Sequence, residues 1–371
     1  MATEPVCVCV EDFEKIAEEK LPMSVREYYN SGANYENTFK DNRKAFGRYK
    51  VRPKYMRDVS NRSMATTILG HKVDCPIGVS PVAMCRLAHP DGEVAVARAC
   101  AKLGRCFILS TMATTGMKEI GEKAPDCLRW FQVHILRDRN LLIQLVQRAE
   151  RAGFTALVLT VDCPVYGRRH AEMRNDFNLP STHKLGVLEG LRSRTGMSEE
   201  EREAGMTKFL NNLFTSAATW DDLRWLKTIT KLPVVIKGIT TGDGAREALR
   251  AGADAILVSN HGGRELDSVA ATIDALQEVV EAVEDRCEVY LDGGVRSGLD
   301  ALKAIAMGAR AVFVGRPILW GLAYAGEEGA EKLLQILGDE LSTDMALAGS
   351  NSIREISRDM VVHKSYYSSK L

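Results

Sequence analysis

Short apolar runs of four or five residues alternate along this chain with longer segments whose apolar residues recur every three or four positions. The short runs are typical of buried parallel strands, and the longer period is typical of amphipathic helices. Helices are predicted to begin after Asp138 and after Ser297, which forms a capping pattern with Asp300. In the second helix Leu299 is expected to face inward. The eight predicted strands are residues 77–80, 107–110, 129–133, 156–160, 233–237, 255–259, 288–292 and 311–315.

Eight strand–helix repeats predict an α/β fold, namely a closed (β/α)8 TIM barrel. A doubly wound open sheet is the alternative. Such a sheet normally carries a glycine-rich loop after its first strand, whereas the sequence at that point is Ser80-Pro81-Val82-Ala83. The barrel is therefore the preferred architecture.

The predicted barrel occupies residues 71–345 of a single domain. Residues 1–70 are predicted to form a helical extension, with one helix opened by Ser24 and Glu27, that covers the bottom and side of the barrel. A polar insertion at residues 178–218 follows the fourth strand and is either a lid over the barrel mouth or a disordered decoration. Residues 346–371 form a C-terminal tail.

Composition excludes several classes of function. Basic and acidic residues balance at 49 each, so no positive field is present to attract nucleic acid. The amino-terminal residues do not resemble a secretory signal, and no apolar run approaches the ~20 residues of a membrane span. The nine cysteines are scattered without a Cys-x-x-Cys pair, which predicts free thiols in a reducing compartment and no metal site.

A histidine and an arginine follow one predicted strand directly. His261 and Arg264 lie just past the apolar run 254–258, with two glycines between them. The carboxyl ends of parallel strands are where reacting groups collect in such folds. Histidine exchanges a proton near neutral pH, and arginine binds a carboxylate through two hydrogen bonds. The pattern predicts a site that holds a small acid and removes a proton from it.

Two glycine–arginine turns follow the seventh and eighth strands. Glycines allow backbone N–H groups to approach an oxyanion, and loops at these two places form the usual phosphate site of a barrel. Tight turns with surface arginines are the alternative. The predicted phosphate-binding residues are Asp292, Gly293, Gly294, Val295, Arg296, Gly315 and Arg316.

Polar residues also end other predicted strands. Lys237 points either into the barrel mouth or along the surface as a strand-end lysine. Asp162 would orient His261 if the two are close, and Arg169 would be a second carboxylate clamp; a surface salt bridge between them is the alternative. Ser110 and Thr111 end the second strand, and Gln132 and Thr160 end the third and fourth. Polar groups at these successive strand ends together describe a cofactor pocket.

Five motifs give the chain a close resemblance to the FMN-dependent α-hydroxy-acid oxidases, from about residue 10 to the end. The most specific motif is residues 259–267. The others are residues 28–33, 81–83, 292–296 and 315–317. The resemblance implies a barrel that binds FMN and oxidises an (S)-2-hydroxy acid to a 2-oxo acid.

The resemblance also assigns roles to individual residues. It implies that His261 is the catalytic base and that Asp162 is its partner. Substrate would contact Tyr28, His134, Arg169 and Arg264. FMN would contact Pro81, Val82, Ala83, Ser110, Gln132, Thr160, Lys237 and Ser259, with its phosphate at residues 292–296 and at Gly315 and Arg316.

Three positions bear on the acceptor and the substrate. Ala83 is the small residue expected of family oxidases, which favours O2 as acceptor and H2O2 as product. His134 stands where the family usually has a tyrosine, and a histidine can carry charge. Met112 stands where glycolate-preferring members have tryptophan, which predicts room for a medium- or longer-chain substrate. A dehydrogenase with another acceptor, and a weakly active FMN-binding barrel caused by His134, are the alternatives.

The chain closes on Ser369-Lys370-Leu371, which matches the peroxisomal address read by an import receptor. An ordinary frayed tail is the alternative. We therefore expect a peroxisomal protein. The family resemblance further implies a homotetramer.

Overall fold

The computed structural model describes residues 6–190 and 206–368 and confirms the predicted barrel. Eight parallel strands close in the order β10-β11-β4-β5-β6-β7-β8-β9. Their centre holds large apolar side chains such as Trp130, Tyr290 and Phe313, so the barrel is a packed core. The strands are β4 (Ile77–Val79), β5 (Cys106–Leu109), β6 (Leu128–Val133), β7 (Ala156–Thr160), β8 (Val234–Ile239), β9 (Ala255–Val258), β10 (Glu288–Asp292) and β11 (Ala311–Val314).

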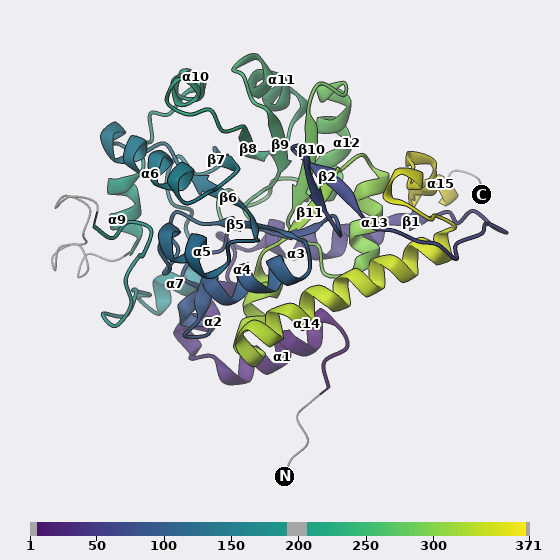
Figure 1. Ribbon diagram of the computed structural model, residues 1–371, viewed down its shortest axis with the longest axis horizontal. Coiled ribbons are helices and arrows are strands. Elements are labelled where there is room, and N and C mark those ends of the chain that lie inside the picture. Colours follow the sequence, from purple (N-terminus) through teal and green to yellow (C-terminus); the bar gives the residue numbers. More distant parts are fainter. Residues whose placement is uncertain (1–5, 191–205, 369–371) are drawn as a thin grey trace, which may run out of the picture.

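Amphipathic helices surround the strands (Figure 1). Two predicted starts are confirmed, because Asp138 accepts hydrogen bonds from the first turn of α6 and Ser297 forms a capping box with Asp300. Leu299 is 36% exposed, so its predicted inward orientation is wrong. The outer helices are α4 (Gly92–Lys102), α5 (Met117–Lys123), α6 (Arg139–Arg151), α10 (Trp220–Ile229), α11 (Gly242–Arg250), α12 (Thr272–Val283), α13 (Gly298–Ala306) and α14 (Arg316–Ala348), which is kinked at Ala325 and Gly326.

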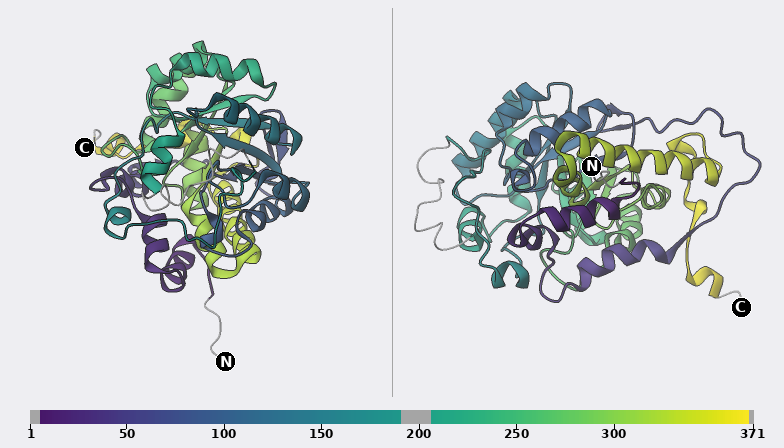
Figure 2. Two further views of the ribbon diagram at one scale, coloured as in Figure 1. Left: turned by 90° about the vertical axis from the view of Figure 1, so that its left-hand side faces the viewer. Right: turned by 90° about the horizontal axis from the view of Figure 1, so that it is seen from below.

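The amino-terminal extension, predicted to cover the bottom and side of the barrel, also reaches its opposite end. Its strand β2 (Thr66–Ile68) pairs with β3 (His71–Val73), which follows the extension, and this hairpin packs against the bottom of the barrel core. Helices α1 (Val10–Lys20), α2 (Met23–Asn30) and α3 (Asn37–Ala45) instead contribute residues to the cleft at the opposite end. The second helix begins at Met23 after Pro22 rather than at Ser24, because proline readily precedes a first turn. Figure 2 shows α1 beside α14.

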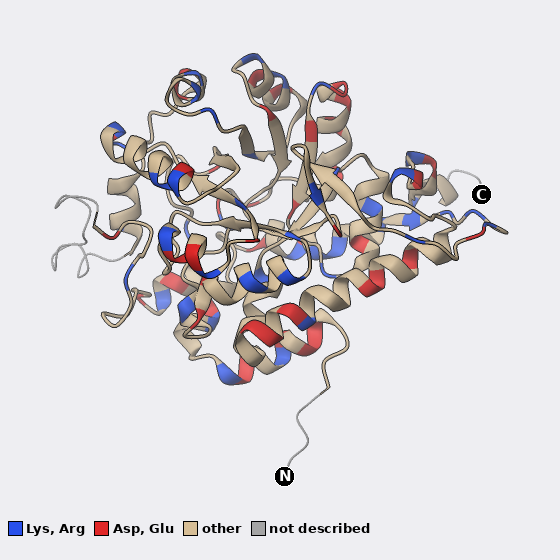
Figure 3. Ribbon diagram, viewed as in Figure 1, with Lys and Arg blue, Asp and Glu red and all other residues tan. Residues whose placement is uncertain are grey.

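The remaining elements lie in the amino-terminal extension, the connections between strands and helices, and the tail. The insertion is described at its two ends, and its residues 191–205 lie outside the described part of the chain. In the described residues, no helix is long and apolar enough to cross a membrane. Charges of both signs are interspersed over the outer helices (Figure 3). The remaining elements, which do not belong to the barrel or its outer helices, are η1 (Phe46–Arg48), β1 (Tyr49–Val51), η2 (Cys85–Leu87), α7 (His170–Arg174), α9 (Met206–Leu213), η3 (Ile353–Glu355), η4 (Arg358–Met360), β12 (Val361–His363) and α15 (Ser365–Ser368).

Candidate active site

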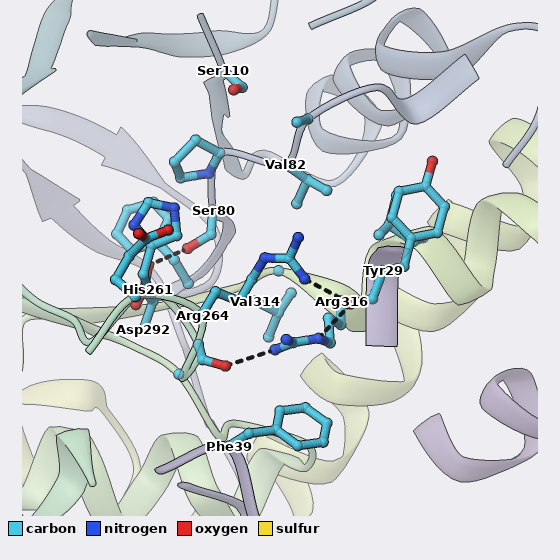
Figure 4. Close-up of a pocket in the computed structure, with 18 of the residues that line it drawn as sticks. Tyr29, Phe39, Ser80, Val82, Ser110, His261, Arg264, Asp292, Val314 and Arg316 are labelled. Atoms are coloured by element: carbon cyan, nitrogen blue, oxygen red, sulfur yellow. Dashed lines mark hydrogen bonds between the residues drawn. The ribbon is translucent and has the colours of Figure 1, made fainter. Parts of the chain in front are cut away.

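One cleft at the carboxyl ends of the barrel strands gathers nearly all of the predicted site residues (Figure 4). Its volume, counted with its open mouth, is about 1390 Å³. Asp162 and Ser259 do not line the cleft. They lie directly behind His261 and Lys237, to which they are hydrogen-bonded.

The loop after β9 makes a left-handed turn, which sets the direction of its side chains. His261, Gly262 and Gly263 all have positive φ angles, of 56°, 64° and 75°. A Cβ atom on Gly263 would lie 2.5 Å from the backbone nitrogen of Phe39, so only glycine fits there. The Ser259 hydroxyl accepts a hydrogen bond from the His261 N–H at 3.1 Å, which further fixes the turn.

His261 and Asp162 form a pair, as the sequence predicts. The Nδ1 atom of His261 lies 3.0 Å from Oδ1 of Asp162. Burial alone would raise the pKa of the Asp162 carboxyl, but the neighbouring His261 and Lys237 bring it below its ordinary value. An ionised Asp162 accepts the Nδ1 proton and leaves the Nε2 lone pair available. The geometry therefore suits a base whose protonated form is stabilised from behind.

Lys237 points into the barrel mouth and is 3% exposed, so the surface alternative is wrong. Its ammonium donates to Ser259 Oγ at 2.9 Å and lies 3.7 Å from the Asp292 carboxylate. Ser80 donates to the same carboxylate oxygen of Asp292 at 2.8 Å. The other oxygen of Asp292 is buried without a hydrogen-bond partner in the described residues. This buried polar floor suits a polar cofactor that supplies the missing partner.

A second hydrogen-bonded group joins the ends of β5, β6 and β7. The Gln132 amide donates to Thr160 Oγ1 at 3.0 Å and accepts from the Thr111 backbone N–H at 3.1 Å. Ser110 Oγ also donates to that amide oxygen, at 3.4 Å. Pro81, Val82 and Ala83 line the same cleft from the loop after β4. Polar groups beside an apolar wall match the edge and face of a heteroaromatic ring.

Arg316 is a partly buried cation held by backbone carbonyl oxygens. Its guanidinium donates to the carbonyl oxygens of Tyr29 at 2.7 Å, Gly262 at 3.0 Å and Ser31 at 2.8 Å. In the described part of the chain no carboxylate forms an ion pair with it. Burial, together with the nearby arginines, lowers its pKa. A cation held in this way favours binding of an anion from outside the chain.

The other predicted phosphate residues surround the same region. Gly294 has a φ of 86°, and a Cβ atom there would lie 2.2 Å from the carbonyl oxygen of Asn42. Arg296 forms an ion pair with Glu14, which also binds Arg43 at 2.9 Å. Glycine turns of this kind expose backbone N–H groups to an oxyanion. These residues fit the phosphate of FMN.

The cleft carries an excess of positive charge. Its lining carboxylates are Glu14, Glu265 and Asp292. Its cations are twice as numerous, so an anionic ligand is favoured. The lining cations are Arg43, Arg169, Lys237, Arg264, Arg296 and Arg316.

Arg169 and Arg264 meet at the outer part of the cleft. Arg169 does not contact Asp162, so the surface salt bridge weighed as an alternative is wrong; it binds Glu172 at 3.1 Å and Glu265 at 2.7 Å. Arg264 binds Glu172 at 3.0 Å and lies 5.2 Å from the centre of the Tyr28 ring. The two arginines are thus held together by carboxylates.

His134 is neutral in this environment, which corrects the expectation that it can carry charge. Its ring stacks on Phe214 with centroids 4.0 Å apart. Burial, followed by the proximity of His261, lowers the pKa of His134 to about 3. Near neutral pH its imidazole therefore offers one donor and one acceptor, closer to a tyrosine hydroxyl than a cation would be.

Several residues of the site were not identified from the sequence. Glu265 lies inside the most specific motif, and Glu172 lies three residues after Arg169, but carboxylates are so common in loops that neither carries a signal of its own. Helix α9 contributes Leu210, and Phe214 follows it directly. Asn42 and Asn260, 218 residues apart, exchange two hydrogen bonds of 2.8 Å.

Comparison with known proteins agrees with this geometry. Residues 17–363 match the FMN-dependent dehydrogenase family model. The chain is 46% identical to 2-hydroxyacid oxidase 1 of Homo sapiens over 96% of this chain and 97% of that protein, and 48% identical to glycolate oxidase 3 of Arabidopsis thaliana over 94% of each. A crystal structure of mandelate oxidase superposes with a TM-score of 0.87 at 39% identity, covering 95% of this chain and 98% of that one.

The chain therefore belongs to the FMN-dependent dehydrogenase family and is an FMN-dependent oxidoreductase. The predicted resemblance and the predicted cofactor are both confirmed. The roles assigned to individual residues remain proposals.

Replacing Arg316 with methionine should weaken FMN binding by about tenfold to a hundredfold, because charge-assisted hydrogen bonds are worth roughly 1.5–3 kcal/mol. Quenching of FMN fluorescence on titration into apoprotein measures the affinity. Arg286→Met, a half-exposed arginine just before β10, is the matched control. An unchanged dissociation constant in the Arg316 variant would remove this arginine from the phosphate site.

Replacing His134 with tyrosine should make the free energy of unfolding depend less on pH on the acid side of neutrality. An unfolded histidine binds a proton below pH ~6.5. Folded His134 does so only near its pKa of about 3, so its neutral burial costs stability as the pH falls between these values. The cost is up to ~1.4 kcal/mol per pH unit. Urea unfolding of the holoprotein at pH 7.5 and 5.0 measures it, with the exposed His71→Gln as control. If the free energy of unfolding changes by the same amount between the two pH values in wild type and in His134→Tyr, His134 is not held neutral.

Proposed function

We propose that this protein oxidises (S)-2-hydroxy acids of medium or longer chain to 2-oxo acids, with O2 reduced to H2O2. The observation that carries the proposal is the His261–Asp162 pair at 3.0 Å, set in the same cleft as two arginines and the cationic phosphate region. A base, a carboxylate clamp and an FMN site are the parts that this reaction requires.

The chain's own residues bind the substrate and move its proton. Arg169 and Arg264 hold the substrate carboxylate, and Tyr28 and His134 contact its C2 end. His261 Nε2 takes the proton released at C2, from either the hydroxyl group or the carbon. Asp162 stabilises the imidazolium that forms. FMN held at the strand ends would supply the two-electron redox chemistry that links the hydroxy acid to O2. Overall, one hydroxy acid and one O2 give one oxo acid and one H2O2.

Apolar side chains support the preference for a longer substrate. Met112, Leu210 and Phe214 line the cleft together with His134. A flexible methionine beside aliphatic and aromatic residues can accommodate a hydrocarbon chain, and each buried methylene contributes about 0.8 kcal/mol. Ala83, which lines the cleft, supports O2 as acceptor. The named relatives are oxidases of glycolate and 2-hydroxy acids.

Anaerobic mixing of the yellow holoprotein with straight-chain (S)-2-hydroxy acids tests the proposal. Flavin absorbance should bleach, fastest with chains longer than glycolate. His261→Gln should bind FMN normally yet slow bleaching by about a hundredfold or more, because a positioned base contributes at least that much.

Readmission of air separates the acceptors. Rapid return of the flavin colour with one H2O2 per substrate oxidised is expected, whereas slow return of the colour in air would indicate another acceptor. No bleaching with any hydroxy acid would contradict the proposed function.

We also propose that the protein is imported into peroxisomes and forms a homotetramer. Ser369-Lys370-Leu371 lies outside the described residues, and the adjoining α15 has no buried residue, which supports access by an import receptor. Removing these three residues from a fluorescently tagged chain should move it from peroxisomes to the cytosol. The tag must precede residue 1. Peroxisomal fluorescence in the truncated chain would contradict the address.

A further inference from the structure

Glu265 is a buried carboxylate whose two oxygens are both occupied. One oxygen accepts from Arg169 Nη2 at 2.7 Å, and the other accepts from the backbone N–H of Gly167 at 2.8 Å. The side chain is 5% exposed and lines the cleft. It therefore joins the loop after β9 to the loop after β7 at the place where the substrate carboxylate is proposed to bind.

Arg169 has little hydrogen-bonding capacity left for a substrate. A guanidinium has five N–H donors. Those of Arg169 reach the Arg264 carbonyl oxygen, the Tyr166 hydroxyl, Glu172 and Glu265, which leaves one donor on Nη2 without a partner in the described residues. The clamp as a whole thus offers fewer donors than two free arginines.

The charge of the clamp is also reduced. Glu172 accepts from Arg169 at 3.1 Å and from Arg264 at 3.0 Å, and Glu265 accepts from Arg169. The two guanidinium groups are therefore matched by two carboxylates within hydrogen-bond distance. A substrate carboxylate therefore meets oriented N–H donors whose own charge is largely offset by these two carboxylates, which reduces the advantage of a carboxylate over a neutral group.

Resting on the proposed function, we propose that Glu265 is a specificity-determining residue that weakens the preference of this site for a carboxylate over a neutral carboxamide. The substrate class accordingly widens from 2-hydroxy acids to 2-hydroxy amides. Recognition of the substrate's C1 group then depends on hydrogen bonds more than on charge. Glu265 does not touch the reacting atoms, so it acts as a positioning and charge-setting residue.

The test compares 2-oxohexanoate with 2-oxohexanamide as ligands of the oxidised holoprotein, followed by the change in flavin absorbance. In the wild type the two dissociation constants should differ by less than about tenfold. Glu265→Gln keeps the shape and removes the charge, and should raise the amide-to-acid ratio by about tenfold, the size of a nearby charge in a partly screened site. Glu265→Asp retains the charge and should keep the wild-type ratio even if both ligands bind more weakly. Glu122→Gln, an exposed change on α5, is the control for net charge.

The ratio separates charge from structure. Loosening of the loops weakens both ligands together and leaves the ratio unchanged, and that result in a folded, FMN-loaded Glu265→Gln would overturn the inference. If this variant does not fold, Glu172→Gln removes a charge from the same cluster and must raise the ratio. The proposed function fails separately, when wild-type holoprotein neither binds 2-oxohexanoate nor is bleached by (S)-2-hydroxyhexanoate.

Discussion

The left-handed turn at His261–Gly263 is the constraint on which the rest of the site depends. Gly263 packs against the backbone of Phe39, and its carbonyl oxygen accepts the Ala33 N–H at 2.8 Å. The Gly262 carbonyl accepts from Arg316, and Arg264 follows the turn directly. One short loop therefore positions His261, Arg264 and Arg316, and it fixes the amino-terminal extension over the cleft.

Charge is distributed unevenly along the cleft. Arg316 is held by carbonyl dipoles and has no ion pair within residues 6–190 and 206–368, so binding of a strongly anionic group is favoured there. In the substrate region carboxylates accompany Arg169 and Arg264 closely. Burying a cation without its counter-ion is costly, which couples stable folding of this end of the barrel to cofactor binding. Arg169 and Arg264, in contrast, already have carboxylate partners within the chain.

Local patterns predicted the barrel and much of the site because both depend on short-range features. Eight apolar runs predicted the strands, and the glycine–arginine turns directly after two of them do line the cleft, as their position after the strands predicted. What failed depends on distant contacts. The position of α2 and α3 at the mouth, and the pairing of Asn42 with Asn260, join segments more than 200 residues apart. The neutrality of His134 also could not be predicted, because it results from burial against Phe214, which belongs to another segment.

Helix α9 and Phe214 belong to the insertion rather than to the eight repeats, yet they form part of the apolar wall of the cleft. The residues proposed to hold FMN come from the strand ends and the loops that follow them. If the proposed function holds, substitutions in the inserted segment alter the apolar wall without touching the residues proposed to hold FMN. The substrate range of such an enzyme can in this way change in evolution through substitutions on one side of the cleft.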